Sequence, residues 1–293
     1  MINRKLTGEK PKMTLPAGAI DTQMHMYLPG FPAMPGGPGL PLDPLPDDDA
    51  YRSLMQWIGI DRVVITQGNA HQKDNANLVA CLKEMGPNVS RGVAVISGQT
   101  PAAELKTLAD AGVTAARIMD LPGGAIGLDA LEEVDAICLD MGWAMAVQFN
   151  GSDLSTHYDR LAALRSNWIL DHHGKFFRGL LPEDPEVTLV RKLIDKGNCY
   201  YKFAGCYESS LKGGPDYADI AAIARVIASH APERLIWGTN WPHNMAQKEE
   251  DYPDDALLLD TVLGWLPDEQ SLQLALVDNP ERLFAFEPWD QAR

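Results

Sequence analysis

The chain has 293 residues, a hydrophobic fraction of 45% and a formal net charge of −15 at pH 7. This length and hydrophobicity suit a globular protein with one large core, since α/β barrels reach roughly 250 residues or more as a single domain. The acidic balance argues against nucleic acid or an anionic membrane surface as a partner, although a few local arginines would still bind a small acidic substrate.

Cysteine usage and hydropathy indicate the cellular setting. Cys81, Cys138, Cys199 and Cys206 have no CxxC spacing, so we expect reduced, buried thiols and neither a disulfide framework nor a zinc site. The first residues include basic side chains but no apolar segment of the kind found in secretion signals. No run of about 18 apolar residues occurs, so we expect no membrane span and a cytoplasmic location.

In chain order, the sequence begins with a polar segment, residues 1–16, which contains Pro11 and Pro16 and which we interpret as an N-terminal arm. Over residues 17–293, short apolar or β-branched runs alternate with longer segments of helical period. The short runs predict strands over 18–25, 62–67, 91–97, 115–119, 144–150, 168–173, 199–205 and 235–240. The longer segments predict helices over 47–58, 73–85, 101–111, 127–141, 155–166, 184–196, 216–231, 254–265 and 268–284.

Eight strands that are each followed by a helix predict a single-domain (β/α)8 barrel, the TIM barrel. A doubly wound sheet is the alternative, but no glycine-rich phosphate-binding fingerprint follows the first strand. Residues 28–46, LPGFPAMPGGPGLPLDPLP, are too rich in proline and glycine for regular structure and predict a long loop. Loops of this length in compact domains are often functional.

Polar side chains gather at the ends of the predicted strands, where barrel enzymes place their active sites. In chain order the most informative of them are Gln23, His25, His71, Arg117, Gln148, Asp171, His172, Lys202, Asn240 and His243. Arg117 stands inside a predicted strand, and a buried guanidinium needs a partner. That partner is either an acidic substrate or a protein carboxylate such as Asp120.

Three stretches of the sequence point to one family, and they read IDTQMHM (20–26), ILDHHG (169–174) and LIWGTNWPH (235–243). Together with HQKDN (71–75), they resemble the amidohydrolase superfamily and, within it, the amidohydrolase-2 group. The resemblance extends from about Pro16 to Phe286. It implies a (β/α)8 barrel that acts on carboxylated lactones, and it points to the lactones of D-galactarate in hexuronate catabolism.

The same resemblance implies a metal site, with His-x-His on strand one, a carboxylated lysine or glutamate on strand four or five, histidines on strands five and six, and aspartate on strand eight. Four of these positions hold other residues here, namely Gln23, Arg117, Gln148 and Asn240. Only His25 and His172 remain of the usual set. Because catalytic zinc usually has at least three good protein ligands, we predict no metal and no other cofactor.

Asn240 indicates the reaction. In hydrolases of the superfamily the strand-eight aspartate takes a proton from the attacking water, which an amide cannot do near neutral pH. A pocket without this base still suits acyl transfer between two hydroxyls of one substrate. We therefore predict a metal-independent isomerase that interconverts the 1,5- and 1,4-lactones of a sugar diacid. A lactonase that uses another base, such as His172 or Asp171, and a non-catalytic barrel that binds a sugar acid remain as alternatives.

We expect His25, His172 and Asn240 to be catalytic, the histidines by donating hydrogen bonds to an oxyanion or by acting as acid and base. Arg117 is expected to hold the free carboxylate of a sugar-acid lactone. The expected substrate contacts also include Gln23, His71, Gln148, Lys202 and His243. For Gln23 and Asn240, the alternative is a purely structural amide.

Overall fold

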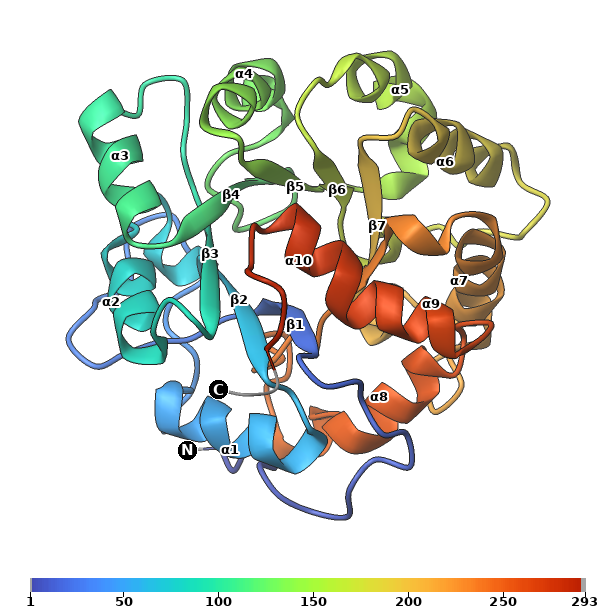
Figure 1. Cartoon of the computed structure of the whole chain (residues 1–293), viewed down its shortest axis with the longest axis horizontal. Helices are drawn as coiled ribbons and strands as arrows, with labels where there is room; N and C mark the ends of the chain where they lie inside the picture. The colour runs from blue at the N-terminus through green and yellow to red at the C-terminus, as the bar shows by residue number, and fades with distance from the viewer. Residues whose placement is uncertain (1, 291–293) are drawn as a thin grey trace.

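The computed structural model describes residues 2–290, so residue 1 of the predicted arm and residues 291–293 lie outside the described part of the chain. Eight parallel strands pair in the order β1 to β8, and helices surround them (Figure 1). The strands are β1 Ile20–Met24, β2 Arg62–Thr66, β3 Ser90–Ala94, β4 Val113–Met119, β5 Ala144–Gln148, β6 Trp168–Leu170, β7 Cys199–Phe203 and β8 Leu235–Trp237. The predicted (β/α)8 barrel is confirmed.

The helices fall where the helical periodicity predicts them, with shifts of a few residues at their ends. They are α1 Asp48–Ile58, α2 Ala76–Met85, α3 Ala102–Asp110, α4 Leu131–Met141, α5 Leu154–Ala163, α6 Pro185–Asp195, α7 Ala218–His230, α8 Asp255–Leu263, α9 Glu269–Gln273 and α10 Asn279–Leu283. The last predicted helix is divided, because a π-helical turn separates α9 from α10 just before Pro280. Proline has no backbone N–H to continue the ladder of the preceding turn.

Alternate strand positions face the barrel interior and form two layers of opposite character. Near the amino ends of the strands the layer is apolar and contains Ile20, Val64, Val93, Ala115, Ala144, Ile169, Tyr200 and Ile236. Phe284 and Phe286 complete this cluster, and α10 lies across the same end of the barrel (Figure 1). Two residues further along four of the strands come the buried polar side chains Thr66, Arg117, Asp171 and Lys202. The site therefore lies at the opposite, carboxyl end.

The seam between β1 and β8 is closed by an isolated backbone bridge, Met24 to Trp241, which lies just beyond the end of β8. Side-chain hydrogen bonds reinforce it. The buried carboxylate of Asp21 accepts hydrogen bonds from Thr239 N (3.0 Å) and Thr239 Oγ1 (2.5 Å). It also accepts one from Tyr51 Oη (2.8 Å). Asp21 thus fastens the first strand to the segment that follows the last.

Gly238 permits the closest approach at this seam. A Cβ atom at position 238 would lie 2.5 Å from the Cβ and the backbone nitrogen of Gln23, a distance that no side chain tolerates. Glycine is therefore required where the two segments pass each other. As a result Gln23 and Asn240 are neighbours, joined by a hydrogen bond from Asn240 N to Gln23 O (2.8 Å).

Residues 2–13 of the predicted arm pack along the outside of the barrel. Ile2 is buried, and the guanidinium of Arg4 donates to the carbonyl oxygens of Leu42 (2.9 Å) and Pro44 (2.5 Å). Further along, the backbone N–H groups of residues 12 and 13 donate to the carboxylate of Asp260 in α8. The arm therefore joins the long proline-rich loop to α8.

The predicted loop 28–46 has no helix or strand. It packs on the segment that follows β2, with Met34 N donating to Ala70 O (2.7 Å). All four cysteines are buried and free. Among residues 2–290, no helix is long and apolar enough to cross a membrane.

Candidate active site

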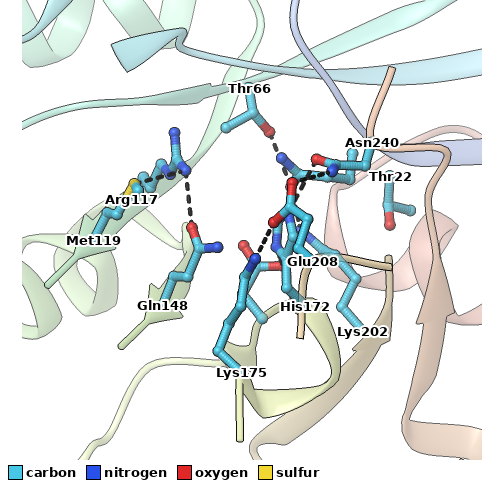
Figure 2. Close-up of polar contacts among 12 residues, drawn as sticks. Thr22, Thr66, Arg117, Met119, Gln148, His172, Lys175, Lys202, Glu208 and Asn240 are labelled. Atoms are coloured by element: carbon cyan, nitrogen blue, oxygen red, sulfur yellow. Dashed lines mark hydrogen bonds and ion pairs between the residues drawn. The ribbon is translucent and has the colours of Figure 1, made fainter. Parts of the chain in front are cut away.

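A cavity of about 280 Å³ opens at the carboxyl end of the barrel. Its walls come from strand ends and from the segments that follow them, which is where barrel enzymes bind substrates. Five of the predicted site residues line it: His25, Arg117, Gln148, His172 and Asn240. In Figure 2, Arg117, Met119 and Gln148 lie together on one side, and Lys175, Glu208, His172 and Asn240 lie on the other.

Arg117 on β4 brings a buried positive charge to the cavity, with 4% of its surface exposed. Its Nη atoms donate only to neutral acceptors, which are Gln67 O (3.2 Å), Asn69 Oδ1 (3.1 Å), Met119 Sδ (3.1 Å) and Gln148 Oε1 (2.9 Å). Among the described residues it takes part in no ion pair, so the partner Asp120 considered from sequence is not used. Burial lowers the pKa of Arg117, yet a guanidinium stays cationic at neutral pH. The cavity therefore offers an unpaired cation to an anionic ligand.

His25 follows β1 and is neutral. Its Nδ1 lies 2.9 Å from the backbone oxygen of Thr66, and a carbonyl can only accept, so Nδ1 carries the proton. Nε2 is then an acceptor, and the side-chain nitrogen of Gln23 donates to it across a long contact of 3.5 Å. Burial and, after it, the charge of Arg117 lower the pKa of His25 to about 3. A substrate hydroxyl can replace this long contact as the donor to Nε2, whereas His25 cannot donate a hydrogen bond through Nε2.

Asn240 is fully engaged by protein groups. Its amide nitrogen lies 2.8 Å from Glu208 Oε1 and 2.8 Å from Tyr207 Oη. A carboxylate only accepts, so this nitrogen donates and Oδ1 faces Nε2 of His172, which donates to it (3.0 Å). The chain of hydrogen bonds continues outward, because Tyr207 Oη donates to His243 Nδ1 (2.7 Å) and His243 Nε2 donates to Asp255 (3.1 Å).

Glu208 and Lys175 form an ion pair at the same end of the cavity, and Figure 2 shows the contact. Lys175 is buried and Glu208 is partly buried, with 4% and 13% of their side-chain surfaces exposed. Burial raises the pKa of Glu208, but Lys175 and then His172 outweigh burial and lower it to about 2. Glu208 is thus an ionised carboxylate that borders the cavity at neutral pH.

His172 stands above a second, fully buried ion pair. Asp171 and Lys202 are both 0% exposed at the side chain and lie 3.2 Å apart. Burial raises the pKa of Asp171, but Lys202 and His172 hold it well below its ordinary value. Nδ1 of His172 lies 3.0 Å from Asp171 Oδ1 without the alignment of a hydrogen bond, and Nε2 donates to Asn240, so both ring nitrogens lie against protein groups.

The other four predicted contacts do not line the cavity. Lys202 donates to Gln23 Oε1 (2.8 Å), and both lie in the polar layer beneath the site. His71 packs against Tyr27 and donates to the carbonyl of Pro32 in the long loop. His243 points to Tyr207 and Asp255, as described above. These four side chains are near strand ends, as predicted, but their direction makes them supports of the lining residues.

Four polar lining residues were not predicted from sequence: Asn69, Lys175, Glu208 and Asn244. Glu208 closes a short 3-10 turn, η5 (Cys206–Glu208), directly after β7, so its place beyond a strand end was the available signal. Its direction depends on Gly205, which has φ of 58°. A Cβ at Gly205 would lie 2.9 Å from both Asn240 Nδ2 and His172 Cδ2. A glycine here lets the turn pass under the site.

The segments after β6 and β8 hold several residues in the left-handed region. Positive φ values occur at His172 (50°), His173 (53°), Asn240 (62°) and His243 (58°). Side chains other than glycine rarely adopt this backbone conformation, and it concentrates at functional sites. The strained backbone aims His172 and Asn240 at each other across the cavity floor.

The comparisons with known proteins agree with the geometry. An amidohydrolase family model matches residues 20–286. The chain belongs to the amidohydrolase family. Among curated members, D-galactarolactone isomerase of Agrobacterium fabrum (strain C58 / ATCC 33970) is 56% identical over 285 residues, covering 97% of each chain. The 2-pyrone-4,6-dicarbaxylate hydrolase of Comamonas testosteroni is 31% identical and covers 94% of this chain and 92% of that protein. An apo crystal structure from Agrobacterium tumefaciens is 56% identical with a TM-score of 0.95, covering 98% of this chain and 100% of the other.

The donor set of this amidohydrolase does not fit the metal centre that the family resemblance implies. No group of three or more His, Cys, Asp or Glu side chains within residues 2–290 is arranged to hold a metal ion. Nδ1 of His25 is protonated toward Thr66, and the nitrogens of His172 face Asn240 and Asp171. Two histidines and neutral amides are a poor divalent site.

Proposed function

We propose that this protein isomerises the lactone of a sugar diacid, converting D-galactaro-1,5-lactone to D-galactaro-1,4-lactone without a metal. The Agrobacterium relative that shares 56% of its residues bears the name of this activity. Within the site, the observation that carries the proposal is the buried, unpaired guanidinium of Arg117. The lactone of a diacid has one free carboxylate, which a guanidinium binds in a bidentate manner.

The reaction is an acyl transfer within one molecule. The hydroxyl on C4 attacks the lactone carbonyl carbon C1, forming the C1–O4 bond. The tetrahedral intermediate then collapses, the C1–O5 bond breaks, and O5 becomes a hydroxyl. One proton leaves O4 and one proton reaches O5, so the reaction consumes neither water nor a co-substrate.

The lining residues have matching roles in this proposal. Arg117 and Gln148 hold the carboxylate end of the substrate. His25 accepts a hydrogen bond from a substrate hydroxyl through Nε2, and His172 and Asn240 fix the floor beneath the reacting carbon. Lys175 has three donors, of which Glu208 occupies one, so its ammonium can stabilise the oxyanion that develops on the carbonyl oxygen.

Hydrolysis of a carboxylated lactone is the second candidate. The Comamonas relative, at 31% identity, is named as a hydrolase, and the carboxylate of Glu208 at the cavity could activate a water molecule. A third candidate, a barrel that only binds sugar acids, predicts binding without turnover. Location in the cytoplasm and a place in hexuronate catabolism stay predictions of the sequence.

The test is an NMR time course of fresh D-galactaro-1,5-lactone with EDTA-treated protein, beside a sample without protein. The proposal expects the 1,4-lactone to appear faster than in the control while free galactarate does not. Faster release of galactarate would identify a lactonase. If both rates equal those of the control, turnover of this substrate is excluded, and repeating the assay with Zn²⁺ tests the claim of metal independence.

A further inference from the structure

Glu208 is the only carboxylate among the described residues that line the cavity. It lies at the end of the cavity opposite Arg117 in Figure 2, with Lys175 and Asn240 on either side. A substrate whose carboxylate rests on Arg117 therefore extends its far end toward Glu208. An ionised carboxylate at that point can accept hydrogen bonds, or a proton, from hydroxyls of the substrate.

The other groups at this end are poorly suited to accept a proton from a hydroxyl. Both ring nitrogens of His172 face Asn240 and Asp171. The amide of Asn240 has no basic atom, and Lys175 is a cation paired with Glu208. Nε2 of His25 already accepts from the side-chain nitrogen of Gln23 (3.5 Å), and the charge of Arg117 beside the ring opposes its protonation.

Glu208 is held in one geometry by two donors of opposite kind. The amide nitrogen of Asn240 donates to Oε1 (2.8 Å), and the ammonium of Lys175 contacts Oε2. Each carboxylate oxygen has a second lone-pair site that these contacts leave open, because a carboxylate accepts up to about four hydrogen bonds. The group is therefore both fixed and able to accept a proton.

We propose that Glu208 is the catalytic residue that carries the proton from the attacking hydroxyl to the leaving ring oxygen, with Asn240 and Lys175 as positioning residues. This role rests on the proposed isomerase function. O4 loses its proton to the Glu208 carboxylate as the C1–O4 bond forms. The resulting carboxylic acid returns the proton to O5 as the C1–O5 bond breaks, and Glu208 is again an anion.

One carboxylate is enough because of the substrate's own geometry. O4 and O5 stand on neighbouring carbons, and both are bonded to C1 in the tetrahedral intermediate. A single group beside them can serve the first as a base and the second as an acid. No water molecule has to enter the site.

The role of Glu208 also explains why position 240 has an amide. Asn240 donates to both Glu208 and Tyr207, and a carboxylate at 240 could donate to neither. It would also place two carboxylates in contact, which disfavours ionisation of both. The sequence therefore has its reactive carboxylate after β7 and a neutral donor after β8.

The experiment compares wild-type protein with Glu208→Gln in the NMR assay, after subtraction of the uncatalysed rate. We expect kcat to fall at least about 100-fold, since general acid–base catalysis contributes typically 10² to 10⁴-fold. Binding of galactarate, measured by calorimetry, should be retained within a few fold because Arg117 is untouched. Glu132→Gln is the matched control, because Glu132 is an exposed glutamate on α4 that pairs with Arg160 outside the cavity.

A second variant separates chemistry from folding. In Glu208→Ala, added formate should restore part of the lost activity in proportion to its concentration, which a purely structural defect would not allow. If the wild type isomerises the lactone, two outcomes overturn the role of Glu208 and leave the proposed function in place. One is a Glu208→Gln variant that is as active as wild type. The other is a folded but inactive Glu208→Ala variant that formate does not rescue. A wild-type protein that forms neither the 1,4-lactone nor galactarate overturns the proposed function and this role with it.

Discussion

At the scale of single residues, the buried charge of Arg117 lowers the stability of the free protein, and a bound anionic ligand would offset this loss. Its charge is buried among neutral acceptors, and an unpaired buried ion is destabilising. We predict that Arg117→Met leaves the ligand-free protein at least as stable as wild type while weakening substrate binding by roughly 10- to 100-fold, the loss of charged hydrogen bonds of about 1.5–3 kcal/mol.

Thermal unfolding without ligand, together with KM, measures both effects. Arg160→Met is the control, because Arg160 is an exposed arginine that pairs with Glu132 outside the cavity. A variant at position 117 that unfolds earlier yet binds substrate normally would show that Arg117 is a structural residue.

His25 should respond to the ligand through Arg117. Burial and the Arg117 charge lower the pKa of His25 to about 3 in the free protein. A bound carboxylate neutralises that charge, so we predict that the pKa of His25 rises when galactarate binds. Histidine ring signals followed by NMR across pH, with and without galactarate, measure the shift. In Arg117→Met the pKa should already be higher and should hardly move with ligand; an unchanged wild-type value would contradict the coupling.

Lys175 should set the acid limit of activity. It is the main charge that lowers the pKa of Glu208 to about 2 against the effect of burial, with His172 next. Removing the ammonium in Lys175→Met raises that pKa, so Glu208 is protonated at a higher pH and can no longer accept a proton. We predict that kcat is lost at a higher pH on acidification than in wild type. A pH profile of kcat tests this, with exposed Lys106→Met as control; superimposed acid limbs would refute it.

At the scale of elements, the seam between β1 and β8 depends on Asp21. Its carboxylate satisfies the backbone N–H and the hydroxyl of Thr239 and the hydroxyl of Tyr51. Asp21→Ala leaves these buried donors without an acceptor, at about 1–3 kcal/mol each. We predict a fall in unfolding free energy of about 3 kcal/mol or more, measured by urea denaturation. Exposed Asp110→Ala should change it by less than about 0.5 kcal/mol; equal effects of the two would disprove the clamp.

At this same scale, the turns that follow the strands set the direction of the side chains in the site. β6 and β8 end at Leu170 and Trp237, earlier than their predicted ends at 173 and 240. His172 and Asn240 therefore lie on left-handed backbone that follows the strands, and their side chains meet across the cavity. The sequence places both residues just beyond strands, but strand alternation could not have given the direction of their side chains.

At the scale of the whole molecule, the N-terminal arm supports one wall of the cavity. Lys5 pairs with Asp254 and Asn3 contacts Glu249, both in the segment that precedes α8. The same segment contributes Asn244 and Met245 to the lining. We predict that deletion of residues 2–13 lowers the melting temperature and raises KM, because this wall loses its outer contacts.

Hydrogen exchange should then increase in 42–46 and 244–254, while the barrel strands keep their protection. The full-length protein under the same conditions is the reference. Unchanged exchange in both segments after deletion would show that the arm does not hold either segment in place.

The sequence by itself determined the barrel fold and the end of the barrel at which the cavity lies. Apolar runs spaced by helical periods predict eight βα units, because a strand and a helix bury their faces at different intervals along the chain. The same pattern put His25, Arg117, Gln148, His172 and Asn240 at the carboxyl end, and all five line the cavity. The amide at position 240 predicts that the reaction is not hydrolysis, and this stays a prediction.

Only the tertiary structure decided which polar groups face the substrate. Lys202 and Gln23 satisfy each other beneath the site, whereas Glu208, one of 40 acidic residues, turns inward past Gly205. Local sequence fixes backbone preference over a few residues. The direction of a buried charge depends on partners from other strands, since an ion is buried only where the assembled barrel supplies its counter-charge and its hydrogen bonds.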